Sequence, residues 1–209
     1  MTAPFTTRDL AGDLLAIADA EGAERFTVVG VSLGAQAAIE LAVAQPERVQ
    51  ALFLMGATGR AQSALDVVAN RALTFLLEPL GLRRFVAGKA LSVLFGPTFR
   101  VEQPAAREEQ RKRIAALDGR DAAFAVRCWA GRRRQLDVAS ALRMPVRIAV
   151  GEEDGACPPP VAVELAAAIA GARVERVVGA GHTIPLEQPT RGGDLLAQLL
   201  AETASPHIA

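Results

Sequence analysis

The sequence predicts an α/β fold: a mostly parallel sheet with helices on both faces and a block of helices inserted between two strands. Two observations carry this prediction. Apolar runs typical of buried strands alternate with helical segments, which is the pattern of a parallel sheet. One internal stretch, residues 60–134, has helical signals and no convincing strand. We therefore expect an α/β core made of residues 1–59 and 135–209, and a helical lid or cap made of residues 60–134.

Composition limits the class of protein. The chain has 209 residues, of which 51% are hydrophobic, so one sizeable core is feasible. The 23 basic and 23 acidic residues cancel, which argues against a nucleic acid or an anionic membrane as partner. Met1–Leu10 has no apolar signal-peptide core, and no charge-free apolar run is long enough to cross a membrane. Two cysteines, Cys128 and Cys157, make no disulfide framework, so we expect a cytoplasmic protein.

The first part of the chain predicts a helix, a strand, a second helix and a second strand. Thr6–Ala20 is amphipathic, with a capping threonine at its start. Arg25–Val31 has a continuous apolar character, so we expect a strand buried on both faces. The helix over 35–44 ends before Pro46, and Val49–Met55 is the second buried strand.

The inserted block predicts four helices, separated by prolines and glycines: Ala61–Leu77, Leu82–Phe95, Ala105–Leu117 and Asp121–Ala130. Its charge runs, Arg107–Arg113 and Arg132–Arg134, are interpreted as solvated faces, with Glu108 and Lys112 spaced to pair at i,i+4. Its large apolar residues fit an apolar pocket, but we favour packing within the block: Phe75, Leu76, Phe95, Phe99, Phe124 and Trp129.

Strand signals return after Pro145. We expect a strand at Val146–Val150, a helix at Val161–Ile169, a strand at Arg173–Val178 and a closing helix that includes Asp194–Ala201. Because these strands again alternate with helices, they should extend the same parallel sheet.

One stretch combines a strand signal and a helix signal around a serine. Residues 30–34 read Gly-Val-Ser-Leu-Gly, after a β-branched run and before a helix-forming segment. In this context the motif predicts a sharp strand-to-helix turn that exposes the oxygen of Ser32. Glycines two residues before and two residues after the serine allow the turn. The backbone N–H of Leu33, at the start of the helix, would face an oxyanion. The alternative interpretation is a glycine-rich turn with no chemical role.

A serine hydroxyl is a weak nucleophile and needs a base nearby. His182 follows a predicted strand in the segment Gly-Ala-Gly-His-Thr, whereas the other histidine, His207, lies three residues from the end. A carboxylate must orient the base, and Asp154 follows the preceding strand. Ser32, Asp154 and His182 would all lie beyond the carboxyl ends of parallel strands, where sites of such sheets form. Taken singly, His182 could be a surface residue and Asp154 a turn former. We interpret Cys157, close to Asp154 in sequence, as a packing residue, and we see no metal-ligand spacing.

These residues resemble the α/β-hydrolase fold superfamily, from about residue 5 to residue 203. The resemblance rests on 30–34, 45–49, 151–154 with Pro158, and 181–182 followed by 187–189. Within the superfamily the chain is most similar to the small esterase, lactonase and haloperoxidase-like branch, which includes 3-oxoadipate enol-lactonases. The resemblance implies a Ser32 nucleophile, a His182 base and an Asp154 partner that cleave an ester or lactone through an acyl-enzyme, without a cofactor.

The resemblance also implies a departure. Members of this superfamily normally have several strands and a helix before the segment with which this sequence starts. That part would carry a His-Gly type loop with the second oxyanion N–H, and would flank the strand at residues 25–31. Losing one such donor typically costs about 10²–10³ in rate. We therefore expect an N-terminally shortened core whose strand 25–31 is an open edge, and such an edge favours self-association.

The sequence is compatible with three functions. The ordered triad predicts a serine hydrolase of small esters or lactones. The expected open edge favours a relic or interaction module with impaired catalysis. A third, weaker hypothesis gives the same triad to acyl transfer or cofactor-free oxygen chemistry, and the helical cap would decide it.

Overall fold

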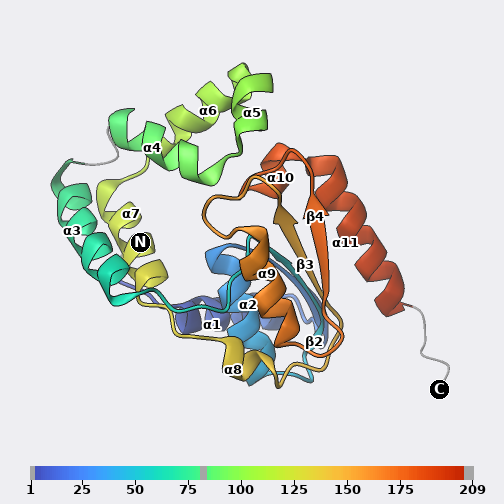
Figure 1. Cartoon of the computed structure of the whole chain (residues 1–209). Coiled ribbons are helices and arrows are strands. Elements are labelled where there is room, and N and C mark those ends of the chain that lie inside the picture. Colours follow the sequence, from blue (N-terminus) through green and yellow to red (C-terminus); the bar gives the residue numbers. More distant parts are fainter. Residues whose placement is uncertain (1–2, 81–83, 205–209) are drawn as a thin grey trace.

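The computed structural model describes residues 3–80 and 84–204 and contains a four-stranded sheet (Figure 1). The strands lie in the order β1-β2-β3-β4, and every neighbouring pair is parallel. Their bounds are Phe26–Val31, Val49–Met55, Val146–Gly151 and Arg173–Val177. The expected fold class, an α/β fold with a parallel sheet, is confirmed.

Helices cover both faces of this sheet, as the sequence predicts. One face packs against α2 (Leu33–Ala44), α8 (Leu136–Ala139) and α9 (Pro159–Ala167), with α1 (Thr7–Ala20) beside α2. The other face packs against α10 (Ile184–Glu187) and α11 (Pro189–Ala204). Helix α1 begins with the expected cap: Thr6 and Asp9 form a capping box.

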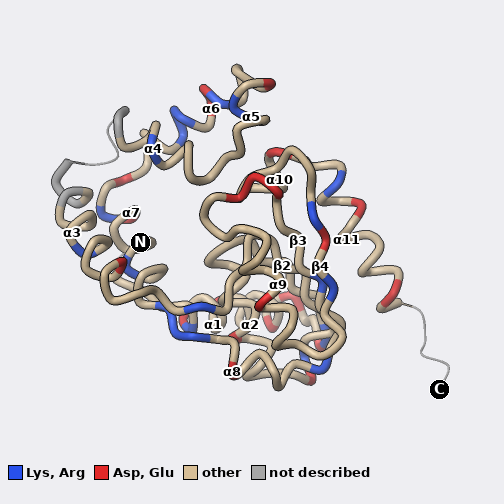
Figure 2. Tube along the Cα trace, viewed as in Figure 1, with Lys and Arg blue, Asp and Glu red and all other residues tan. Residues whose placement is uncertain are grey.

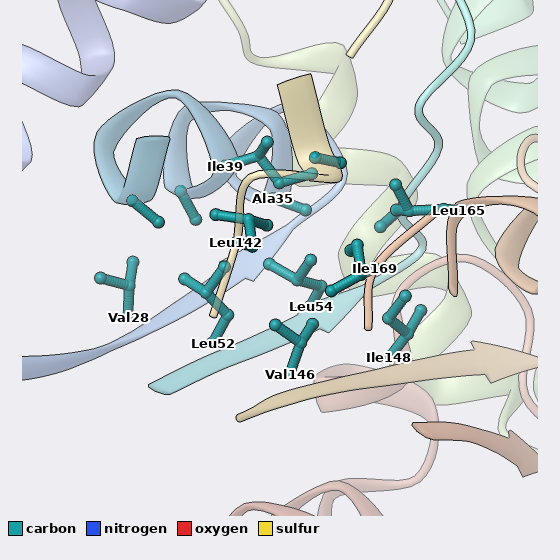
Figure 3. Packing of buried hydrophobic residues seen from close by; sticks show 14 of the residues in the cluster. Val28, Ala35, Ile39, Leu52, Leu54, Leu142, Val146, Ile148, Leu165 and Ile169 are labelled. Carbon is teal, nitrogen blue, oxygen red and sulfur yellow. The ribbon is translucent and has the colours of Figure 1, made fainter. Parts of the chain in front are cut away.

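The period of two residues along β2 divides the core between these faces. Leu52 and Leu54 point into the cluster beneath α2 and α9, and Figure 3 shows them among Ile39, Ile148 and Leu165. Their neighbours along the strand, including Phe53, join the cluster beneath α10 and α11. β2 is therefore buried on both faces, as its continuous apolar sequence predicts.

For β1 the same expectation is wrong. Val28 is buried under the first face, but Val29 on the opposite face is 45% exposed. Helix α11 packs on β2 and β3, and of the described β1 residues Val31 packs against the cluster beneath this helix while Val29 does not. The apolar sequence of β1 therefore predicts a strand, but it does not predict how much of that strand the helices cover.

The two edge strands differ in charge. β4 carries Arg173, Glu175 and Arg176 among its five residues, whereas β1 has no charged residue. Charged side chains on an edge strand discourage pairing with another chain. The β4 edge is protected in this way and the β1 edge is not.

Between β2 and β3 the described chain holds helices without an intervening strand: α3 (Ala64–Leu80), α4 (Arg84–Leu94), α5 (Pro97–Glu102), α6 (Pro104–Ala115), α7 (Gly119–Ala130) and α8. Two small apolar clusters join α3 to α7 and α4 to α5 and α6. In Figure 1, α4, α5 and α6 lie beyond the carboxyl ends of β3 and β4. Division of the chain into a core and a cap domain stays a prediction.

Within this block the packing expectation holds for some residues and fails for another. Phe95 and Phe99 are buried and stack with ring centroids 4.9 Å apart, and Phe124 is buried as well. Phe75, in contrast, is 74% exposed, so the expectation that it packs is wrong. Helical spacing placed Phe75 on α3 but did not show which face of that helix is covered.

The charge runs agree only in part with the sequence analysis. Helix α6 has no buried residue, so Arg107–Arg113 forms a solvated helix face as predicted. Glu108 binds Arg111 at i+3, where the sequence suggested Lys112. Arg132 is not simply solvated, because its guanidinium lies 4.7 Å from the centre of the Trp129 ring. Figure 2 shows basic and acidic residues interspersed along the helices.

The sequence missed three short helices, α5, α8 and α10, and the closing helix expected to include Asp194–Ala201 is α11. Leu82, where a helix was expected to begin, lies outside the described residues, as do Met1 and His207. Within the described ranges, no helix combines the length and the apolar character of a membrane span.

A test of the core compares two positions on α9. Leu165 is fully buried against the sheet, whereas Val163 is 55% exposed. We expect Leu165→Ala to lower the free energy of unfolding by about 2–5 kcal/mol, because it leaves a cavity. Val163→Ala should change it by about 0.5 kcal/mol or less. Urea unfolding followed by circular dichroism measures both, and equal losses would contradict this packing.

Candidate active site

The motif around Ser32 folds as the predicted turn between β1 and α2. Ser32 has φ 52° and ψ −112°, and it is the only non-glycine residue with positive φ in the described chain. Such a backbone costs about 1–3 kcal/mol and persists only where the surroundings enforce it. The Ser32 N–H donates to the Met55 carbonyl at 2.8 Å, and the Ser32 carbonyl accepts from Ala35 N–H at 3.0 Å. The Ser32 side chain does not cap α2, so its hydroxyl is not used by the helix that it precedes.

Of the two motif glycines, the structure requires only the first. A Cβ on Gly30 would lie 2.6 Å from the Ala35 Cα and 2.6 Å from the Gly34 carbonyl oxygen. A Cβ on Gly34 would have no atom within 4 Å. Close approach of α2 to β1 thus depends on Gly30, and the expectation that Gly34 also prevents a clash is wrong.

Asp154 and His182 meet at the carboxyl ends of β3 and β4. The Asp154 Oδ2 and the His182 Nδ1 lie 2.9 Å apart, and both side chains are almost completely buried. The other carboxylate oxygen, Oδ1, accepts the N–H groups of Ala156 and Cys157 at 2.8 Å each. Both oxygens of Asp154 are therefore engaged, and the carboxylate is fixed in the orientation that holds the imidazole.

Gly56 links this pair to the serine, and the sequence analysis missed its role. It follows Met55, whose carbonyl accepts the Ser32 N–H, and it has φ +56°. A Cβ at this position would lie 2.8 Å from both Nδ1 and Cε1 of His182. The serine turn thus contacts Met55, the last residue of β2, and the His182 imidazole packs against the next residue, Gly56. A glycine directly after a buried strand was the signal available in the sequence.

The acidic neighbours of Asp154 are engaged elsewhere, so of these three carboxylates it is Asp154 that contacts His182. Glu152 faces Arg176 at 3.7 Å, and Glu153 accepts the Thr98 N–H at 2.9 Å. Burial raises the pKa of the Cys157 thiol to about 12, and that of Cys128 to about 11, so both are protonated at neutral pH. This state agrees with the interpretation of Cys157 as a packing residue.

Chemically, this arrangement can support acyl transfer. A serine lies on a strained turn at the start of a helix, whose first backbone N–H groups, including that of Leu33, have no acceptor within the helix. An imidazole with its Nδ1 directed at a buried carboxylate has Nε2 available as a base. Among the described residues, no group of three or more His, Cys, Asp and Glu side chains could hold a metal ion.

Comparison with known proteins identifies the family of this chain. A family model described as the alpha/beta hydrolase family matches residues 2–192. The chain is 27% identical over 206 residues to the proposed carbamate hydrolase RutD of Azorhizobium caulinodans, covering 95% of this chain and 75% of that protein.

Two solved structures show how closely the fold agrees. A thermophilic esterase from Thermogutta terrifontis superposes with a TM-score of 0.92 at 24% identity, covering 98% of this chain and 76% of that one. The enol-lactonase from Burkholderia xenovorans LB400 gives 0.86 at 22% identity, covering 96% and 75%. The fold is that of the α/β hydrolases. The chain belongs to the alpha/beta hydrolase family, and its activity is hydrolysis of the type that this family catalyses.

The two motif glycines provide a test of the turn. Gly30→Ala places a Cβ against backbone atoms that cannot move aside, so it should lower the free energy of unfolding by about 1–3 kcal/mol. Gly34→Ala adds a methyl group in open space within a helix, so stability should stay equal or rise by up to about 1 kcal/mol. Chemical unfolding of the two variants measures the difference. A Gly34→Ala variant as unstable as Gly30→Ala would contradict the described turn.

Proposed function

We propose that the chain hydrolyses a small ester or lactone, with Ser32 as nucleophile, His182 as general base and Asp154 as the group that orients the base. The observation that carries the proposal is the 2.9 Å contact between Asp154 and His182, next to the strained turn at Ser32. Ester-cleaving and lactone-cleaving proteins among the structural neighbours support the substrate class. The alternative substrate class is a carbamate, whose carbonyl carbon also carries an oxygen or nitrogen leaving group.

In the first half of the reaction, the Ser32 oxygen attacks the substrate carbonyl carbon and its proton moves to His182 Nε2. The charged imidazolium is stabilised by the Asp154 carboxylate, and the backbone N–H of Leu33 faces the developing oxyanion. The tetrahedral intermediate then collapses. The carbon–oxygen bond to the alcohol breaks, His182 returns the proton to that oxygen, and an acyl group stays on Ser32.

In the second half, a water molecule takes the place of the alcohol. His182 removes a proton from the water, which attacks the acyl carbon. The bond between the acyl carbon and the Ser32 oxygen then breaks, and His182 gives its proton to that oxygen, so that the acid is released and the Ser32 hydroxyl is regenerated. A lactone would follow the same steps, except that the alcohol and the acid remain parts of one product.

Covalent labelling tests this function. A fluorophosphonate probe should label the purified wild-type chain and not Ser32→Ala, because only an activated serine reacts with it. Turnover of p-nitrophenyl acetate should fall by about 10³-fold or more in Ser32→Ala and in His182→Ala. Circular dichroism would check that both variants are folded. A wild-type chain that neither takes the probe nor exceeds the Ser32→Ala background would exclude the proposal.

The open edge of β1 favours a second role, and we propose that it pairs with a second copy of this chain. The N–H groups of Phe26 and Ser32 donate to the carbonyls of Arg48 and Met55, on the β2 side. The backbone groups of the residues between them alternate in direction, so those of Thr27, Val29 and Val31 point outward. Two such edges can pair antiparallel about a two-fold axis at Val29, which satisfies all these groups, and neither edge carries a charge that would oppose it.

The oligomeric state tests this pairing. Light scattering coupled to size exclusion should give a dimer for the wild-type chain and a monomer for Val29→Pro, because proline removes an outward N–H and cannot pair. Val29→Thr keeps that N–H and should remain dimeric. A wild-type chain that is monomeric at every accessible concentration would contradict the proposal.

A further inference from the structure

Two buried or half-buried carboxylates that the proposed reaction does not use lie beside the residues that it does use. Glu153 directly precedes Asp154 in the chain, and Glu187 lies five residues after His182. Both accept hydrogen bonds from the segment between α4 and the first turn of α5, which belongs to the inserted helices. The loops that hold Asp154 and His182 are therefore joined to the helical block through side-chain carboxylates.

Glu187 has the more complete set of contacts. It is 2% exposed and is the last residue of α10. Its Oε2 accepts the N–H of Gly181 at 2.8 Å, and its Oε1 accepts the N–H of Thr183 at 2.9 Å. These are the residues on either side of His182, so one carboxylate holds the backbone on both sides of the imidazole.

The same carboxylate also reaches the helical block. Its Oε2 accepts the N–H of Gly96 at 2.7 Å, and its Oε1 lies 3.0 Å from the Thr183 hydroxyl, which in turn lies 3.1 Å from the Leu94 carbonyl. At this point the two backbones touch: a Cβ on Gly181 would collide with the Gly96 nitrogen and lie 2.9 Å from its Cα. The His182 loop and the end of α4 are thus packed backbone to backbone around one side chain.

The donors to Glu187 are backbone N–H groups and one hydroxyl, and no ion pair found within the described ranges includes it. A buried carboxylate with such donors is specifically recognised as an acceptor, because three backbone N–H groups are aimed at its two oxygens. The single proton of the Thr183 hydroxyl can be donated either to Oε1 or to the Leu94 carbonyl. An amide in its place would present N–H groups to the donors on one of its two sides. The site is therefore selective for a carboxylate, which is more than filling space would require.

We infer that Glu187 is a positioning residue for His182: it fixes the backbone on both sides of the imidazole and ties that loop to the segment at Gly96. The inference rests on the proposed role of His182 as base. A displacement of about 1 Å in a catalytic group can cost about 10²-fold in rate, so a clamp on its loop acts on turnover more than on substrate binding.

The test compares Glu187→Gln with Glu152→Gln. Both remove one carboxylate charge near the site, but Glu152 lies at the surface facing Arg176, 3.7 Å away. We expect Glu187→Gln to lower kcat for p-nitrophenyl acetate by about 10- to 100-fold with KM changed by less than about 3-fold. Glu152→Gln should keep wild-type values. Wild-type kcat in a folded Glu187→Gln variant would overturn the inference.

A second readout does not depend on turnover. The proton between His182 Nδ1 and Asp154 should give a downfield proton resonance in the wild-type chain, since the two atoms lie 2.9 Å apart in a buried site. In Glu187→Gln this resonance should shift or broaden, and in Glu152→Gln it should not. If the wild-type chain shows the resonance but cleaves no ester, the proposed function fails while the positioning role is still measured. An unchanged resonance in Glu187→Gln would overturn the role.

Should Glu187→Gln fail to fold, Thr183→Val provides the same comparison with a smaller change. It removes one hydroxyl donor and keeps the shape and the backbone N–H. We expect a 2- to 5-fold loss of kcat, about 0.4–1 kcal/mol, and a shift of the downfield resonance. A folded Thr183→Val variant with wild-type kcat and resonance would count against the clamp.

Discussion

The close approach of α2 to β1 at Gly30 is the constraint on which the site depends. No side chain fits between Gly30 and the backbone of Ala35, so the chain must leave the strand and enter the helix within two residues. That turn forces Ser32 into a positive φ, which a non-glycine residue adopts only under such pressure. The hydrogen bond from the Ser32 N–H to β2 holds the strained backbone in place, and the buried core beneath α2 holds the helix against the sheet.

The parallel sheet brings the remaining groups to the same edge. The carboxyl ends of β1, β2 and β3 lie at the same end of the sheet because the strands are parallel, and the segments that follow them carry Ser32, Gly56 and Asp154. His182 reaches this edge from the loop after β4. Residues separated by as many as 150 positions thus meet without a dedicated binding domain, and the helical block adds contacts from outside through Glu153 and Glu187.

Much of this could be predicted from local sequence. The strands have the predicted positions within one residue, and Thr6 caps α1, because apolar period and capping are local signals. The Ser32 turn could be predicted because the spaced glycines lie between a strand signal and a helix signal. Burial was less predictable: Val29 and Phe75 are apolar and exposed, since their cover depends on where α11 and the neighbouring helices end. Short helices such as α10 are stabilised by tertiary contacts and leave little periodic signal.

The local sequence predicts the order of the strands and longer helices, and it indicates Ser32, Asp154 and His182 as candidate groups, because each follows a strand whose pattern is local. That Asp154, and not Glu152 or Glu153, contacts His182 depends on the folded arrangement, since carboxylates in adjacent positions differ only in direction. The folded arrangement also decides that Gly30 is required and Gly34 is not, and that Glu187 holds the His182 loop. These are matters of close approach between segments distant in sequence, and no local pattern records them.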